Sequence, residues 1–224
     1  MTETFEKNGF VVLEDVLIFD DFEIGEIERY KKSHKNENFG KNGIVKIFSW
    51  EKTKTSNLIL NKITDIISSK INIKKEKLVE SFSNKVYYTE DTLETENRNQ
   101  SPHFDSFPKL KAFIYLSDNS KSGSGSISFA KGTHKSWFIN FIKFLRFFYI
   151  PGKYGVDNIL FFKNFKKNLL FTEANGKKYS IVIFKTDTIH LAGKVKHPNF
   201  IRKVIRFDFN TFEYPRSIFK KVIN

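Results

Sequence analysis

The 224-residue chain contains no cysteine. This absence excludes disulfide bridges, zinc–thiolate sites, iron–sulfur clusters and cysteine nucleophiles, so any metal must be held by histidine, aspartate or glutamate. The sequence also lacks a run of about 18 uncharged apolar residues, which excludes a membrane-spanning helix. The N-terminus has no apolar region of the kind that marks a secretory signal. We therefore expect a soluble, cytoplasmic protein of one domain.

Arginine is also scarce, although the chain carries a net charge of +13. Only 6 of the 38 basic residues are arginine, and the other 32 are lysine. Proteins that recognise phosphates or bases favour arginine for its bidentate fork, and no recognition motif accompanies the charge here. This composition argues against a nucleic-acid partner and is typical of an AT-rich genome. An anionic small-molecule substrate is compatible with the charge.

Most of the chain reads as short strands separated by turn signals. Helices are predicted over residues 2–9, 20–35 and 56–69, which would pack outside a sheet. Strand-like runs cover 9–17, 84–91, 109–117, 127–130, 177–185, 188–193 and 201–212. In the run 109–117, Leu110, Ala112, Ile114 and Leu116 alternate onto one face. The pattern predicts a mainly β fold with flanking helices, in the form of a β-sandwich or jelly roll.

The segment 136–150, SWFINFIKFLRFFYI, departs from this pattern because it is apolar nearly all round. At about 15 residues it is too short to span a bilayer. A buried helix packed on the barrel is the interpretation that such composition favours. A lid over the active site, a dimer contact or weak contact with a membrane surface remain alternatives. The oligomeric state does not follow from the sequence.

Two histidines and one aspartate carry the main chemical signal. His103 and Asp105 are two residues apart, so in an extended chain their side chains point to the same side. His190 stands far downstream in a strand-like run. Two imidazoles and a carboxylate form the ligand set that holds ferrous iron on one face. The blander alternatives are a turn-capping Asp105, a surface His103 and a core His190.

Arg202 and Arg206 lie on one face of the last predicted strand, together with Asp208. If that face is interior, these charges need partners. An anionic ligand could pair with one arginine, and Asp208 with the other.

In outline, the chain resembles the phytanoyl-CoA dioxygenase family of iron(II)/2-oxoglutarate oxygenases. The resemblance rests on motifs in the family's order: EKNGFVVLEDVL, HFD, AFIYLSD, GSISFAKGTHKSW, DTIHLAG and FIRKVIRFDF. Residues 136–178 lie outside it. The resemblance implies a double-stranded β-helix of cupin-like type, occupying 81–135 and 178–212 of a single domain over 1–224. Residues 1–80 would supply an N-terminal strand and supporting helices, and 136–177 a variable insertion.

The resemblance also assigns roles by position. His103, Asp105 and His190 would bind Fe(II), and Arg202 would pair with the distal carboxylate of the co-substrate 2-oxoglutarate. Arg206 is the fallback, because the loop 192–200 could shift the register. Phe113 and Tyr87 are further candidate co-substrate contacts. The chain departs from the family pattern at Ala130, Lys131 and Ala192, which replace residues that include a proline and a small hydroxyl residue.

The implied activity is hydroxylation of a small-molecule metabolite with release of succinate and CO2. Asp105 favours this outcome over halogenation, since related halogenases lack the carboxylate. Lys109 and Lys111 are candidate anion contacts. His134 is predicted to be structural, and His34 and His197 to lie at the surface. The alternative from another class is a non-catalytic jelly-roll module that binds a sugar or another ligand.

Overall fold

A computed structural model describes residues 2–17, 19–20, 23–26, 36–37, 44–49, 53–95, 101–105, 109–137 and 168–211. Apart from a helical turn at 23–26, the predicted helix over 20–35 lies outside these residues. The predicted helix over 136–150 also lies outside them from residue 138 onwards. In the part of the chain that is described, no helix combines the length and the apolar character needed to cross a membrane.

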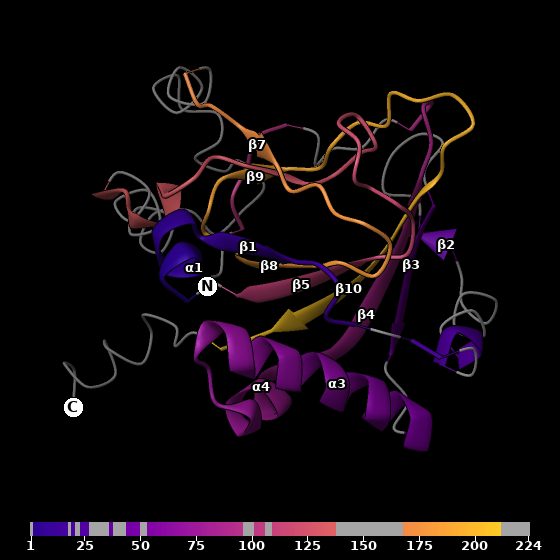
Figure 1. The fold of residues 1–224 in the computed structure, drawn as a ribbon, viewed down its shortest axis with the longest axis vertical. Coiled ribbons are helices and arrows are strands. Elements are labelled where there is room, and N and C mark those ends of the chain that lie inside the picture. The colour runs from indigo at the N-terminus through magenta and orange to yellow at the C-terminus, as the bar shows by residue number, and fades with distance from the viewer. Residues whose placement is uncertain are drawn as a thin grey trace.

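A seven-stranded antiparallel sheet forms one layer of the fold (Figure 1). Its strands are β1 (Phe10–Leu13), β2 (Asn36–Glu37), β3 (Ile44–Ser49), β4 (Phe82–Asp91), β5 (Leu110–Tyr115), β8 (Ile181–Lys185) and β10 (Arg202–Phe209). Their spatial order is β1-β8-β5-β10-β4-β3-β2. Strands distant in sequence are therefore neighbours, as the crossing connections of a jelly roll require.

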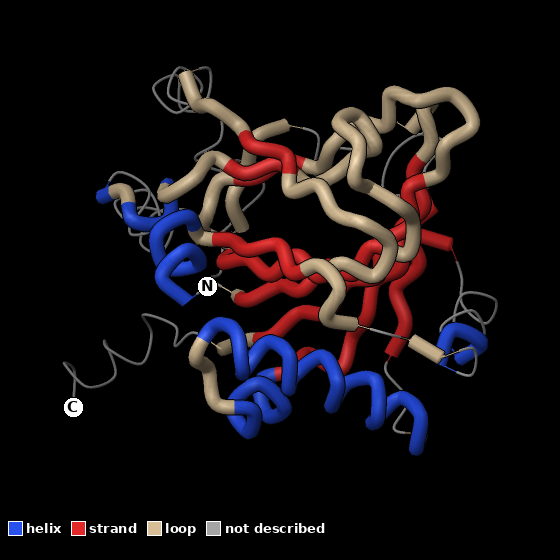
Figure 2. The backbone as a smooth tube through the Cα atoms, in the orientation of Figure 1, coloured by secondary structure: helices blue, strands red, loops and turns tan. Residues whose placement is uncertain are grey.

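A second, smaller sheet faces the interior side of the first. It contains β6 (Ser128–Phe129), β7 (Thr172–Glu173) and β9 (His190–Leu191) in the order β7-β6-β9. Long loops join the two layers and leave them open at the ends (Figure 2). This arrangement confirms the predicted mainly β, cupin-like jelly roll, a double-stranded β-helix with flanking helices.

Helices cover the outer face of the large sheet (Figure 1). The helix α3 (Lys54–Ile71) follows the capping residue Thr53. The Ser56 amide donates to the Thr53 hydroxyl, and the Thr53 amide donates to the Ser56 hydroxyl. It packs with α4 (Lys75–Ser81). The short helix α1 (Thr2–Asn8) precedes β1. The outer core between helices and sheet is aliphatic and aromatic, and includes Ile59, Ile63, Ile67, Val86, Ile205 and Phe207.

Strand β5 separates this outer core from the interior between the sheets. Leu110, Ala112 and Ile114 belong to the outer core, as their predicted alternation requires. Phe113 and Tyr115 point the other way, into a second core with Val204 and Phe129. Lys111 shares the phase of Phe113 and Tyr115, and is therefore a buried cation on the interior side.

Removing a buried side chain of α3 should destabilise the fold strongly. Ile63 is fully buried between helix and sheet. We expect Ile63→Ala to lower the free energy of unfolding by about 2–5 kcal/mol, because a cavity replaces close packing. Leu58→Ala, on an exposed position of the same helix, should change it by only about 0.5 kcal/mol. Equal effects in urea unfolding would contradict this placement of the core.

Candidate metal centre

Backbone pairing brings His103 and His190 together. The His103 amide donates to the His190 carbonyl at 2.9 Å, and the His190 amide donates to the His103 carbonyl at 2.8 Å. Directly opposed residues of an antiparallel pair project to the same face. The two imidazole rings accordingly lie with their centroids 4.4 Å apart. Two backbone hydrogen bonds thus join residues that are 87 positions apart in the sequence.

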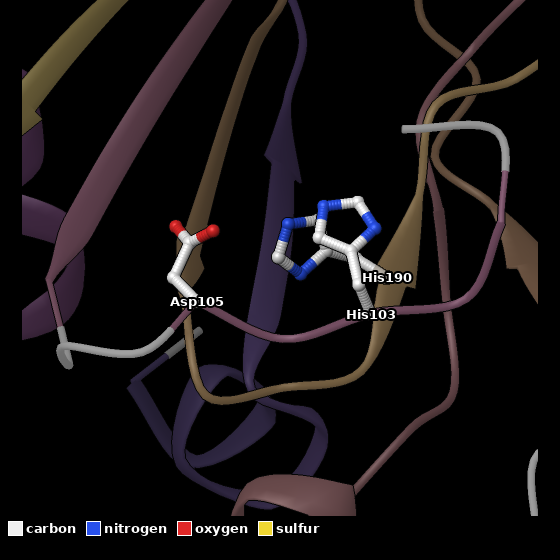
Figure 3. Close-up of side chains that lie close together, drawn as sticks. All are labelled: His103, Asp105 and His190. Carbon is white, nitrogen blue, oxygen red and sulfur yellow. The ribbon is translucent and has the colours of Figure 1, made fainter. Parts of the chain in front are cut away.

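Asp105 completes the group from the same extended segment as His103. Its amide donates to the Thr186 carbonyl at 2.9 Å, which ties this segment to the turn before β9. Figure 3 shows its carboxylate beside the two rings. One ligand atom from each of His103, Asp105 and His190 lies within 4.8 Å of the others. Small side-chain rotations would therefore bring all three within bonding distance of one cation.

Both imidazoles are oriented by backbone carbonyls. Nδ1 of His103 lies 2.8 Å from the Ser101 carbonyl, and Nδ1 of His190 lies 2.8 Å from the Thr188 carbonyl. Since a carbonyl can only accept, each Nδ1 carries the proton in these hydrogen bonds. Each Nε2 is then the unprotonated nitrogen of its ring, the one that can donate a lone pair to a metal. Carbonyl partners of this kind are typical of metal-ligating histidines.

The site is closed on the His190 side and more open on the other. His190 is only 4% exposed and its ring packs against Phe184 and Phe129. Burial, together with the neighbouring His103, lowers the pKa of His190 to about 3, so the ring is neutral at neutral pH. His103 and Asp105 are half-buried. A ligand can therefore approach from their side.

A lysine of β5 binds the carboxylate of the group. Lys111 Nζ lies 2.5 Å from Asp105 Oδ2, and the Lys111 side chain is 11% exposed. Burial alone would raise the pKa of Asp105, but Lys111, His190 and His103 outweigh it and hold that pKa below its usual value. The carboxylate is therefore ionised and ready to act as a ligand. The sequence had indicated Lys111 only as a candidate anion contact.

Arg206 also faces the interior, one strand away from Lys111. Its guanidinium carbon lies 3.5 Å from the centroid of the Tyr87 ring, and its Nε lies 2.9 Å from Asp208 Oδ1. The strand register pairs Asp208 with Lys111 and Arg206 with Phe113. Arg206 therefore lies two positions along β10 from the register partner of Lys111, and its side chain is 22% exposed.

Arg202 occupies a different place on the same strand. It forms a fully buried ion pair with Asp91 of β4. Six residues separate it from Asp208, or roughly 20 Å along an extended strand. Tyr115 lies between these levels and spans the two sheets, donating to the Ala174 carbonyl at 2.9 Å. Arg202 thus lies toward the opposite end of β10 from Asp208, the register partner of Lys111.

The remaining candidate residues fall as follows. Phe113 is partly buried in the interior, with its ring edge-on to Phe184 at 5.1 Å. His134 is buried, and its Nε2 lies 3.0 Å from the Glu6 carbonyl, so it fixes α1 as a structural residue. His197 is at the surface, 3.0 Å from the Ser122 carbonyl. His34 lies outside the described residues.

The donor set fits a divalent first-row transition metal. Two neutral imidazoles and one ionised carboxylate gather on one side of a single position, which leaves the other coordination sites to exogenous ligands. The absence of cysteine disfavours metals that prefer thiolates. Arg206 and Lys111 would favour an anionic ligand beside such a metal.

No protein-family model matches this chain, and no curated protein matches it. Several solved structures do match this chain. The non-heme alpha-ketoglutarate-dependent epimerase SnoN from nogalamycin biosynthesis superimposes with a TM-score of 0.62 at 15% identity, covering 93% of this chain and 80% of its own. HygX from Streptomyces hygroscopicus, solved with nickel, 2-oxoglutarate and hygromycin B, gives 0.56 at 12%, covering 93% and 86%.

A prolyl-4-hydroxylase from Pseudomonas putida gives a TM-score of 0.54 at 10% identity, covering 93% of this chain and 95% of its own. At these identities the comparisons establish the fold. They leave the chemistry of this chain to be argued from its own residues.

Proposed function

We propose that this protein is an Fe(II)- and 2-oxoglutarate-dependent oxygenase that acts on a small molecule. The observation that carries the proposal is the convergence of His103, Asp105 and His190 within 4.8 Å. The carbonyl bonds that orient both imidazoles through Nδ1 add to it, because metal-ligating histidines are commonly held in this way. The structural neighbours named above, which include 2-oxoglutarate-dependent enzymes, support the assignment.

We infer that Arg206 anchors the distal carboxylate of 2-oxoglutarate. It lies two residues from Asp208 and hence roughly 7 Å along the strand from the level of Lys111. Arg202 lies four positions further along the strand from Arg206, roughly 13 Å, and its guanidinium is already paired with the buried Asp91. Tyr87 would hold the Arg206 guanidinium flat against its ring, and Phe113 would line the same space.

The three ligands would occupy one face of the metal. When bound there, iron together with 2-oxoglutarate supplies oxygen activation, with succinate and CO2 as products. The protein's part is to hold the carboxylate and both rings, to exclude water on the His190 side, and to admit substrate on the side of His103 and Asp105. Hydroxylation is the outcome we propose, since Asp105 fills the position that a halide would need.

We further propose that the chain belongs with the phytanoyl-CoA dioxygenase-like oxygenases. This proposal rests on the motifs around His103, His190 and Arg202, which follow one another in the family's order. The structural neighbours include an epimerase, a carbocyclase and a hydroxylase. The fold thus accommodates several oxidative outcomes, and the substrate must be identified by direct assay.

Anaerobic spectroscopy tests the proposal. Adding Fe(II) and then 2-oxoglutarate to the protein should produce a visible metal-to-ligand charge-transfer band, because the co-substrate chelates iron at the three-residue site. The matched control is His197→Ala, which changes a surface histidine and should retain the band. A band that persists when both His103 and Asp105 are alanine would place the metal elsewhere and refute the site.

One observation favours a second candidate, the non-catalytic ligand-binding module. The Lys111 ion pair satisfies Asp105 without any metal. In that case the barrel would bind an anionic ligand through Lys111 and Arg206, and no charge-transfer band would form. Oxygen-dependent succinate release separates the two, because only the oxygenase consumes 2-oxoglutarate.

A further inference from the structure

The candidate ligand Asp105 is already paired with a cation that belongs to the protein. Lys111 enters from β5 on the interior face, with its ammonium group 2.5 Å from the carboxylate. Asp208 of β10 is its register partner, and Arg206 follows two residues away. Lys111 is therefore held between the metal position and the cation proposed to grip the co-substrate.

The charges of this group balance in the absence of any ligand. Lys111 and Arg206 contribute two positive charges, and Asp105 and Asp208 contribute two negative charges. The two histidines, bonded through Nδ1 to carbonyls, are neutral as ligands. A divalent metal alone would leave two positive charges in excess inside the barrel. A divalent metal together with a dianion such as 2-oxoglutarate would restore the balance.

We propose that Lys111 couples the two binding events, weakening the binding of metal alone and strengthening the binding of metal with the dianionic co-substrate. This inference rests on the proposed function. The metal must take Asp105 from Lys111, and the ammonium group released then remains next to the dication. In a poorly solvated interior that repulsion is substantial. A ligand that bears carboxylates offsets this repulsion, because one of its carboxylates can accept hydrogen bonds from the released ammonium group.

The coupling has two measurable sides: the affinity for Mn(II) alone, and the factor by which 2-oxoglutarate changes that affinity, which by linkage is also the factor by which Mn(II) changes the affinity for 2-oxoglutarate. Lys111 should make Mn(II) bind more weakly in the absence of 2-oxoglutarate. It should also increase the factor by which 2-oxoglutarate tightens Mn(II) binding. A lysine that served only to pack the barrel or to support Asp105 would not produce this opposite pair of effects.

The test is anaerobic titration of the full chain with Mn(II), with and without 2-oxoglutarate, in wild type and Lys111→Met. In the variant we expect Mn(II) alone to bind about tenfold more tightly, and the enhancement by 2-oxoglutarate to fall about tenfold. Lys111→Arg retains the charge and should keep most of the enhancement. Lys203→Met removes a cation from the opposite face of β10 and should change neither value.

Weaker or unchanged binding of Mn(II) to Lys111→Met, with the enhancement intact, would overturn the inference. If that variant does not fold, as judged by circular dichroism, Lys111→Gln gives the same comparison with a polar side chain. The results that would refute the proposed function are different ones. It is refuted if wild type binds no Mn(II), or if binding survives alanine at both His103 and Asp105.

Discussion

Replacing His103 with alanine is expected to weaken Fe(II) binding by at least about 100-fold, since even loss of a partner behind a metal ligand costs about 10–100-fold. Oxygen-dependent succinate formation should fall to background. The physical reason is that two ligands on one face no longer hold a metal against water. Isothermal titration with the metal and a succinate assay measure the two effects.

The change should leave the fold intact, because the His103 ring is half-buried and its backbone hydrogen bonds to His190 remain. His197→Ala removes a surface histidine and should match wild type in both assays. If His103→Ala binds Fe(II) as tightly as wild type, His103 is not a ligand and the oxygenase assignment loses its basis.

Arg206→Ala and Arg202→Ala should have opposite consequences. Loss of Arg206 should raise the dissociation constant of 2-oxoglutarate by about 30-fold or more, because a buried charged partner of the ligand is worth about 2–5 kcal/mol. Its effect on thermal stability should be smaller than that of Arg202→Ala, since the Arg206 side chain is 22% exposed and Lys111, the register partner of Asp208, still lies beside that carboxylate. Titration of the metal-loaded protein with 2-oxoglutarate measures the affinity.

Loss of Arg202 should act on the fold. Asp91 would be left as a buried, unpaired carboxylate, which costs about 3–5 kcal/mol of stability. At temperatures where the variant remains folded, its affinity for 2-oxoglutarate should be near that of wild type. The reversed pattern, with Arg202→Ala binding 2-oxoglutarate poorly and Arg206→Ala binding it normally, would assign the co-substrate to Arg202.

The sequence predicted part of this site because two of the three candidate ligands, His103 and Asp105, lie two residues apart. Alternation alone places His103 and Asp105 on one face, and family resemblance adds His190. The structure brings these three together through a single backbone bridge. Our proposal of Arg206 over Arg202 rests on the strand register, which depends on how the loop 192–200 is folded. No local pattern encodes that length.

Lys111 shows another limit of sequence reasoning. The alternation of Leu110, Ala112 and Ile114 puts Lys111 on the opposite face, which was a usable signal. What the pattern omits is that the opposite face is also interior, so that a lysine there must find an anion. Only the packing of the second sheet makes Asp105 that anion.

Several elements were not predicted at all. The helix α4 is short and mostly polar, with Leu78 as its one buried residue, so it has little periodicity to detect. The two-residue strands β2 and β7 are too short to show an alternation pattern and are defined only by their pairing with β3 and β6. Conversely, α3 was predicted over 56–69, close to its observed bounds, because its buried isoleucines recur at helical spacing; the cap at Thr53, which the prediction did not use, starts it two residues earlier.

The most direct test is a crystal structure of the protein grown anaerobically with Mn(II) and 2-oxoglutarate. The account predicts one Mn(II) ion bound by His103 Nε2, His190 Nε2 and a carboxylate oxygen of Asp105, with 2-oxoglutarate chelating it and its far carboxylate on Arg206. An ion bound away from these three side chains, or a barrel that remains closed by the Lys111–Asp105 pair with no ion present, would contradict the account.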